Sequence, residues 1–186
     1  MHDLHAHPPA PSGALMDRTS LALALTAAIA APGLAHGGEW TGAFGGFQFS
    51  ALSGEAAGDD GSGALAGVHA GYNIAFGTFV LGAGVDLDFG GIDLGQSVEV
   101  DGLARLGLRA GADLGRTFVY GTAGFARADT SLGTGEGGYA GVGAGWRVGE
   151  RITVGGEVVY QQFDDVNGSG VDLDATTASA RVTFNF

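Results

Sequence analysis

The chain has 186 residues with a formal net charge of -12, and 37 of the residues are glycine. So acidic a chain lacks the basic face that nucleic-acid binding requires, and the absence of cysteine excludes disulfides, thiolate catalysis and cysteine metal sites. The glycine content is high but lacks the three-residue period of collagen, and the chain is 45% apolar and only 15% charged. This combination is unusual for a soluble domain, but it suits a barrel with a lipid-facing wall and a tight interior.

The N-terminal segment has the layout of a secretory signal peptide. Met16-Asp17-Arg18 precedes an apolar run from Leu21 to Ala31, and small residues precede a possible cut before His36. The run is too short for a transmembrane helix, which needs about 20 apolar residues. We therefore expect a signal peptide at 16–35 and a mature barrel at 36–186, while residues 1–15 are interpreted as an unstructured upstream extension or a mis-assigned start.

From Ala64 onward, apolar residues alternate with small or polar ones, which is the pattern of half-buried strands. The even positions from Ala64 to Phe76 are apolar, and after a turn at 76–77 the odd positions from Phe79 to Phe89 are apolar. Four later segments repeat the alternation, and their apolar sets are Val98, Val100, Ala104, Leu106 and Leu108; Ala140, Val142, Ala144, Trp146 and Val148; Ile152, Val154, Val158 and Tyr160; and Ala178, Ala180, Val182, Phe184 and Phe186.

Two further segments, near 40–50 and 117–126, bring the number of predicted strands to eight. Glycine and aromatic residues occur on both parities in these two segments, so the sequence leaves their facing open. The predicted connections alternate in length, short at 76–77, 111–116 and 149–151, and longer at 51–62, 90–96, 127–137 and 164–173.

Short turns alternating with long loops are typical of outer-membrane barrels, in which the short turns face the periplasm. The predicted fold class is therefore all-β: an eight-stranded antiparallel up-and-down transmembrane β-barrel with a lumen filled by side chains. The alternative is a soluble barrel or sandwich with its apolar faces inward, because periodicity alone does not say which face meets solvent. Aromatics at the ends of the apolar faces favour the membrane barrel.

Several short stretches match a known class of barrels. They are the opening WTGAFGGF, the stretches GLARLGLRAG and FVYGTAGFA, the hairpin GVGAGWRV with GGEVVYQQF, and the closing RVTFNF. On these motifs the chain resembles the proteobacterial outer-membrane β-barrel family, the OmpA-like transmembrane and Opa-like eight-stranded barrels. The resemblance covers about residues 38–186 and implies a location in the outer membrane of a Gram-negative bacterium.

The resemblance also implies that the terminal aromatic strand is an assembly signal read by the barrel-assembly machinery. The residues that match such a signal are Val182, Phe184 and Phe186. Outer-membrane lipid and lipopolysaccharide are the other expected partners, and a monomer is expected. The sequence names no ligand for the surface loops.

Charged residues at the lumen-facing positions of the predicted strands form two groups. Arg105, Arg109, Glu157 and Arg181 are predicted to form ion pairs in the lumen, with Glu157 almost opposite Arg181. A turn near residue 93 would set Asp88 opposite Glu99 and Asp86 opposite Asp101, which makes an acidic outer rim. Opposed like charges are destabilising, so the rim either binds a divalent cation or is wet and screened. The weak coupling of surface charges favours the second interpretation.

Other chemical sites find little support. The segment Asp165–Gly170 resembles the start of a calcium loop, but Thr176 stands where glutamate is needed, so a polar turn is the better interpretation. A lipid-modifying enzyme needs a serine, a histidine and an acid at the lipid face, and His69 lies on the lumen parity instead. We therefore expect a non-enzymatic barrel without metal or cofactor, with a structural or surface-interaction role. The alternatives are a narrow porin-like solute channel and a lipid-modifying outer-membrane enzyme.

Overall fold

The computed structural model describes residues 40–186 apart from 57–58, 95–97, 131–132 and 164–172. The predicted extension and signal peptide, residues 1–35, lie outside the described residues. No helix in the described part of the chain is long and apolar enough to cross a membrane.

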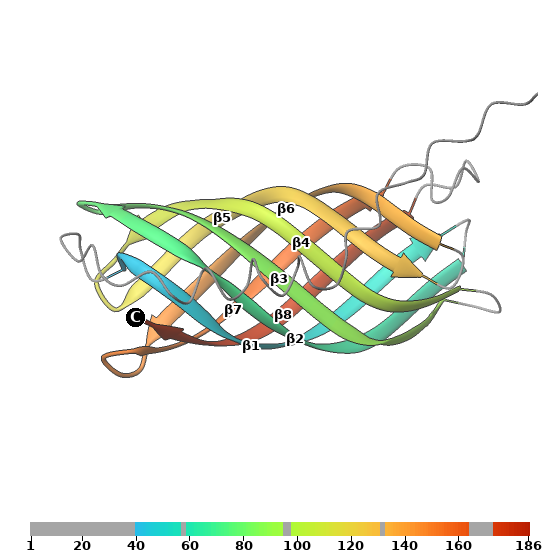
Figure 1. The fold of residues 1–186 in the computed structure, drawn as a ribbon, viewed down its shortest axis with the longest axis horizontal. Coiled ribbons are helices and arrows are strands. Elements are labelled where there is room, and N and C mark those ends of the chain that lie inside the picture. Colours follow the sequence, from blue (N-terminus) through green and yellow to red (C-terminus); the bar gives the residue numbers. More distant parts are fainter. Residues whose placement is uncertain (1–39, 57–58, 95–97, 131–132, 164–172) are drawn as a thin grey trace, which may run out of the picture.

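Eight antiparallel strands form one closed barrel in sequence order, which confirms the predicted fold class (Figure 1). The strands are β1 (Gly42–Ala56), β2 (Asp59–Phe76), β3 (Phe79–Leu94), β4 (Val98–Asp113), β5 (Thr117–Thr130), β6 (Gly133–Arg147), β7 (Ile152–Phe163) and β8 (Leu173–Asn185).

The barrel closes between its first and last strands. The β1–β8 ladder runs from Phe44 opposite Asn185 to Ala56 opposite Leu173. One further hydrogen bond, from the Phe186 N–H to the Ala43 carbonyl at 2.9 Å, extends the seam to the last residue. Because every strand has a neighbour on both sides, the barrel leaves no free sheet edge.

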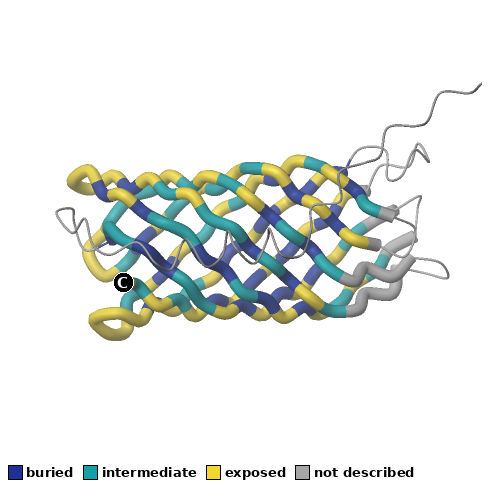
Figure 2. Tube along the Cα trace, in the orientation of Figure 1, coloured by how far each residue is buried: buried dark blue, intermediate teal, exposed yellow. Residues whose placement is uncertain are grey.

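Burial alternates along each strand as the sequence predicts, so one parity faces the lumen and the other faces outward (Figure 2). The alternation also settles the two strands whose facing the sequence left open. In β1 the even positions, such as Gln48 and Ser50, face the lumen, and in β5 the even positions, such as Phe118 and Ala126, do the same.

Three of the four predicted long loops are mostly strand. The ladder of β1 and β2 continues through Glu55 opposite Asp60, and that of β5 and β6 continues through Thr130 opposite Gly133. Glycine, serine and acidic residues in these segments resemble turn residues, but a strand that projects beyond the hydrocarbon layer meets water on its outer face and tolerates them. The prediction of loops at 51–62, 90–96 and 127–137 is therefore wrong in length.

The C-terminus lies at the same end of the barrel as the turns between β2 and β3, β4 and β5, and β6 and β7 (Figure 1). Backbone hydrogen bonds link these turns to adjacent strands, as from the Arg147 N–H to the Arg116 carbonyl at 2.8 Å. By the rule that short turns are periplasmic, this end is the periplasmic end of the barrel.

Candidate functional site: the filled lumen

The lumen is filled in three layers along the barrel axis. At the periplasmic end the side chains of Trp40, Ala75, Val80 and Phe118 form an apolar cluster, with Tyr120 packed against it. Ion pairs occupy the middle. At the outer end a second apolar cluster contains Leu52, Leu65, Leu103, Ala126, Ala128, Tyr139, Val159, Phe163 and Ala175.

Trp40 closes the periplasmic mouth. Its indole N–H donates to Asp113 Oδ1 at 3.0 Å and to the Gly115 carbonyl at 3.2 Å. Its ring lies 5.4 Å from that of Phe118, and the Arg147 guanidinium lies 4.5 Å from its centroid. These contacts hold a large side chain across the mouth. Sequence reasoning missed this role, because Trp40 precedes the first strand and its partners lie more than 70 residues away.

Arg181 organises the first polar cluster of the middle layer. Its guanidinium donates to Glu157 Oε2 at 2.6 Å and also to Asp86 Oδ1. The Tyr120 hydroxyl donates to the same Glu157 oxygen at 2.9 Å. The structure thus brings together Arg181 and Glu157, the pair that the sequence set almost opposite each other, and adds Asp86 as a second acid.

Arg105 and Asp88 form the second polar cluster. The Arg105 guanidinium donates to Asp88 Oδ2 at 2.9 Å, and the two side chains are 1% and 0% exposed. The other Asp88 oxygen accepts from the Gln48 amide at 2.7 Å and the Ser50 hydroxyl at 3.2 Å. Both oxygens of this fully buried carboxylate are therefore satisfied, whereas Nε and Nη1 of Arg105 are buried without a hydrogen-bond partner.

Arg109 takes a different partner from the one predicted. Its guanidinium lies over two aromatic rings: the guanidinium carbon is 4.0 Å from the centroid of the Phe44 ring and 5.3 Å from that of the Tyr120 ring. These distances are in the range of cation–π attraction. The middle layer thus holds three arginines and three carboxylates, and its formal charges cancel.

The structure corrects the predicted acidic rim. Asp86 lies opposite Arg105 and Asp88 opposite Leu103, so both acids are buried in the lumen rather than opposed to other acids. The reason is that the β3–β4 connection falls at 95–97 instead of near 93, and that the register shifts between Phe89 and Ile92. In the observed register Glu99 lies opposite Asp93, whereas the side chains of Glu99 and Asp101 lie outside the described residues.

A small polar cavity of about 40 Å³ lies between the Trp40 layer and Arg181. Its lining includes His69, Asn73, Arg109 and Thr153. His69 Nδ1 and Asn73 Oδ1 are buried without a hydrogen-bond partner, while His69 Nε2 lies 2.8 Å from the Thr183 hydroxyl oxygen. At about 10–15 Å³ for each water, the space holds roughly three to four waters, and such waters would satisfy these atoms.

The described residues offer no group of three or more potential metal ligands. His69 is buried inside the wall and not at the lipid face. The calcium-loop candidate, which starts at Asp165, lies outside the described residues.

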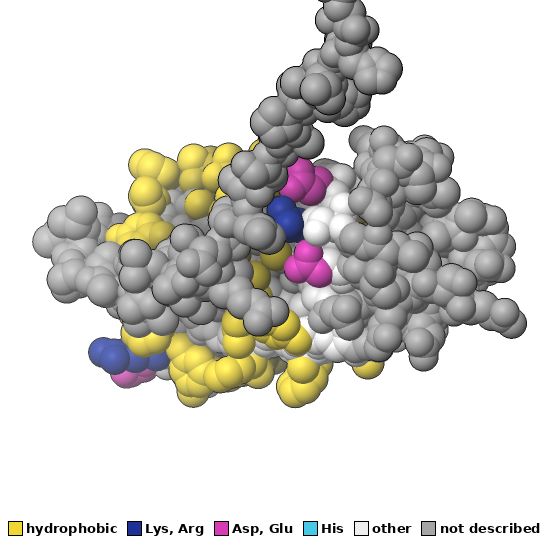
Figure 3. Space-filling model, turned by 45° about the vertical axis from the view of Figure 1, so that its right-hand side comes forward, with side chains coloured by type: hydrophobic (Ala, Val, Ile, Leu, Met, Phe, Trp, Pro, Cys, Tyr) yellow, Lys and Arg dark blue, Asp and Glu magenta, His cyan; other side chains and the backbone are white. Residues whose placement is uncertain are grey.

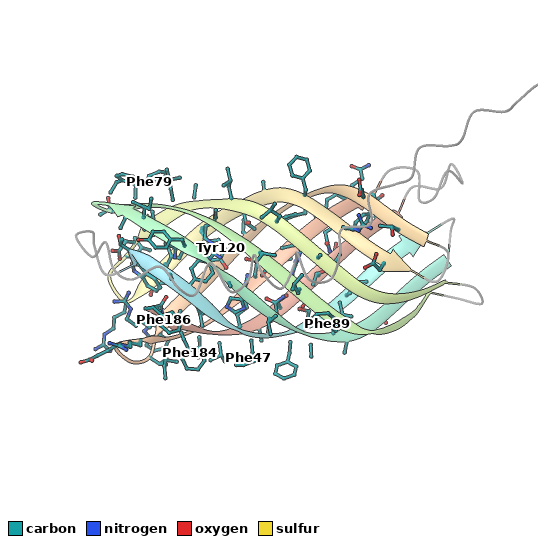
Figure 4. All side chains as sticks on the ribbon, viewed as in Figure 1. Phe47, Phe79, Phe89, Tyr120, Phe184 and Phe186 are labelled. Carbon is teal, nitrogen blue, oxygen red and sulfur yellow. The ribbon has the colours of Figure 1, made fainter. Side chains whose placement is uncertain are left out.

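The outer wall is apolar. Phe125, Phe49 and Leu108 point outward and are 77%, 72% and 70% exposed. In Figure 3 hydrophobic side chains gather over the wall, and charged side chains lie at its edges. Phe79 and Phe184 lie toward the end that carries the C-terminus, and Phe89 lies further along the barrel (Figure 4). The outward residues of the terminal strand, Val182, Phe184 and Phe186, continue this band.

A closed barrel with an apolar outer wall and a filled, partly charged lumen is a transmembrane barrel of the outer-membrane type. A family model described as "Outer membrane protein beta-barrel domain" matches residues 20–186. The chain belongs to this family, and it is an integral protein of the outer membrane of a Gram-negative bacterium.

Two solved structures share the fold. Neisserial surface protein A is 18% identical, with a TM-score of 0.58, and the match covers 78% of this chain and 98% of that chain. Ail, the attachment invasion locus protein of Yersinia pestis, is 12% identical, with a TM-score of 0.52, and the match covers 77% of this chain and 99% of that chain. No match was found among curated proteins.

Proposed function

We propose that this outer-membrane barrel is a non-enzymatic envelope protein whose lumen is closed to steady diffusion. The observation that carries the proposal is the middle layer, where Arg181 bridges Glu157 and Asp86 between two apolar clusters. An eight-stranded barrel is just wide enough for side chains to fill it. A solute would therefore have to displace an ion-pair network and an apolar layer on each side of it.

Conductance in planar bilayers tests this proposal. We expect the purified, folded protein to give no steady current steps of porin size, because three packed layers block the lumen. A general porin reconstituted in the same way serves as the positive control. Long-lived open channels in the absence of the porin would contradict the closed lumen. They would favour the alternative function, a narrow solute channel, which the polar cavity of about 40 Å³ supports to some extent.

The proposed role at the cell surface is structural contact with lipopolysaccharide and membrane lipid. The solved Ail structure is described as a complex with a heparin analogue. This chain carries a net charge of -12, and its outward side chains near the outer end include Asp129, Glu136 and Asp174. Repulsion between like charges therefore argues against direct binding of a sulfated polyanion, and contact with the phosphates of lipopolysaccharide would need bridging divalent cations.

The proposed assembly route relies on the terminal strand. Val182, Phe184 and Phe186 project outward on one face, and the Phe186 N–H completes the β1–β8 seam. We propose that the barrel-assembly machinery recognises this strand before it pairs with β1, and that the folded protein is a monomer without a cofactor.

A further inference from the structure

The terminal strand β8 has a polar lumen-facing side. Each inward residue in its C-terminal part is polar and is hydrogen-bonded to a residue of another strand; these residues are Thr177, Ser179, Arg181, Thr183 and Asn185. The outward face of the same stretch carries alanine, valine and phenylalanine. The strand therefore has a second pattern of side chains besides the outward aromatics that were predicted as an assembly signal.

Two of the inward contacts cross the seam between β8 and β1. The hydroxyl oxygens of Ser179 and Ser50 lie 2.8 Å apart, and the two residues are partners in the β1–β8 ladder. Arg181 reaches further, because it donates to Asp86 on β3, two strands beyond β1. All four residues are buried, so a polar group left without a partner at any of them would be costly.

A third contact passes over a glycine. His69 on β2 and Thr183 on β8 lie on either side of Gly46 of β1, and His69 Nε2 is 2.8 Å from the Thr183 hydroxyl oxygen. A β-carbon at Gly46 would lie 2.9 Å from His69 Nε2, so the missing side chain leaves this path open. The contact therefore depends on which residue of β8 lies opposite Gly46.

The register of the seam has no turn to set it. Consecutive strands are joined by a connection, and the turn type and loop length of a hairpin fix the register of its ladder. Because β1 and β8 are the first and last strands of the barrel, their register follows from contacts between them and across the lumen. A slip of two residues would keep every side chain on its own face, but it would change the stagger of the strands and with it the width of the barrel.

We propose that Ser179, Arg181 and Thr183 select the register in which β8 closes the barrel on β1. A slip of two residues would shift each of them by roughly 7 Å along the seam relative to its partner, at about 3.3 Å per residue. The short hydroxyl side chains cannot follow such a shift. On the outward face Ala180 would merely take the place of Ala178, so these alanines do not distinguish the two registers.

Disulfide trapping measures the seam register directly, since the chain has no cysteine of its own. Ala51 and Ala178 are outward partners in the observed register. A slip of two would instead set Thr176 or Ala180 opposite Ala51, and these diagonal neighbours are now about 7–8 Å away, too far for a disulfide. After refolding from urea into lipid vesicles and oxidation, we expect the pair Ala51→Cys and Ala178→Cys to cross-link at least tenfold more than either slipped pair.

Combining Ser179→Ala, Arg181→Met and Thr183→Val should lower the ratio of observed to slipped cross-links at least fivefold. If this triple variant does not fold, as judged by the migration of unboiled samples on gels, Ser179→Ala with Thr183→Val keeps every ion pair and should lower the ratio at least twofold. Arg105→Met is the matched control. It leaves a buried carboxylate, Asp88, without its arginine, but this pair joins β4 to β3, away from the seam, so the ratio should stay unchanged.

The same ratio in the unaltered chain and in the folded variants of β8 would show that the inward residues do not select the register. An equal fall in Arg105→Met would assign the effect to a general loss of stability and would overturn the proposal as well. The proposal depends on the barrel fold, and vesicles contain no assembly machinery. A conducting barrel, or a terminal strand that the machinery does not recognise, would therefore refute the proposed function and leave this inference standing.

Discussion

Replacing Arg181 with methionine is expected to destabilise the folded barrel by about 3–5 kcal/mol, the usual cost of removing one partner from a buried ion pair. Arg181 is 6% exposed and donates to both Glu157 and Asp86. Methionine has a similar volume but no donors, so two carboxylates would remain in the lumen without their counter-charge. Urea unfolding in lipid vesicles, followed by tryptophan fluorescence, measures the loss.

Arg127→Met is the matched control, because Arg127 pairs with Glu136 at 3.1 Å on the barrel surface, where the two side chains are 52% and 75% exposed. An exposed pair contributes about 0–1 kcal/mol. Combining Arg181→Met with Glu157→Gln removes one stranded charge and should recover part of the stability. Equal unfolding midpoints for Arg181→Met and Arg127→Met would show that the middle layer does not hold the barrel together.

Gly143→Ala is expected to destabilise the barrel by about 1–3 kcal/mol, the range for over-packing a filled interior. A β-carbon at this lumen position would come within 2.8 Å of Tyr120 Cε2. The ring has little room to move, because its hydroxyl donates to Glu157 at 2.9 Å and its face stacks 4.9 Å from Phe118. The same urea titration measures the change.

Gly121→Ala provides the comparison on the outer wall, where the nearest atom to an added β-carbon is the Gly141 carbonyl oxygen at 3.8 Å. We expect this variant to unfold near the midpoint of the unaltered chain. If both substitutions had the same effect, the lumen glycines would not be making room for rings. The structure gives the same arrangement at Gly107, where an added β-carbon would lie 2.8 Å from Tyr139 Cζ.

The proximity of Arg181 and Glu157 could be predicted because β7 and β8 are consecutive strands, and a connection centred within 164–173 sets Glu157 within two residues of the position opposite Arg181. The β3–β4 register could not be placed in this way. The glycine-rich stretch after Phe89 resembles a turn, but it continues as strand with a shift in register. As a result Asp86 lies opposite Arg105 and not opposite another acid. A displacement of the turn by two residues changes which charges meet, although the facing of every side chain is preserved.

The apolar layers of the lumen could not be foreseen from one strand at a time. Alanines such as Ala126 and Ala128 carry little signal on either face, yet here they pack with Tyr139 and Phe163 from other strands. The closing of the mouth by Trp40 likewise depends on Asp113 and Phe118, which only the closed barrel brings near it. Alternation gives the facing of a residue but not its neighbours across the lumen.

Cell fractionation combined with gels of unboiled and boiled samples tests the central claim most directly. We expect the unaltered chain in the outer-membrane fraction, with a shift in migration between unboiled and boiled samples, because a closed barrel resists unfolding in detergent. A chain without Phe186, which loses the hydrogen bond to Ala43 and the last outward aromatic, should reach that fraction in smaller amounts. Recovery of the unaltered chain as a soluble periplasmic protein, migrating identically before and after boiling, would contradict a transmembrane barrel.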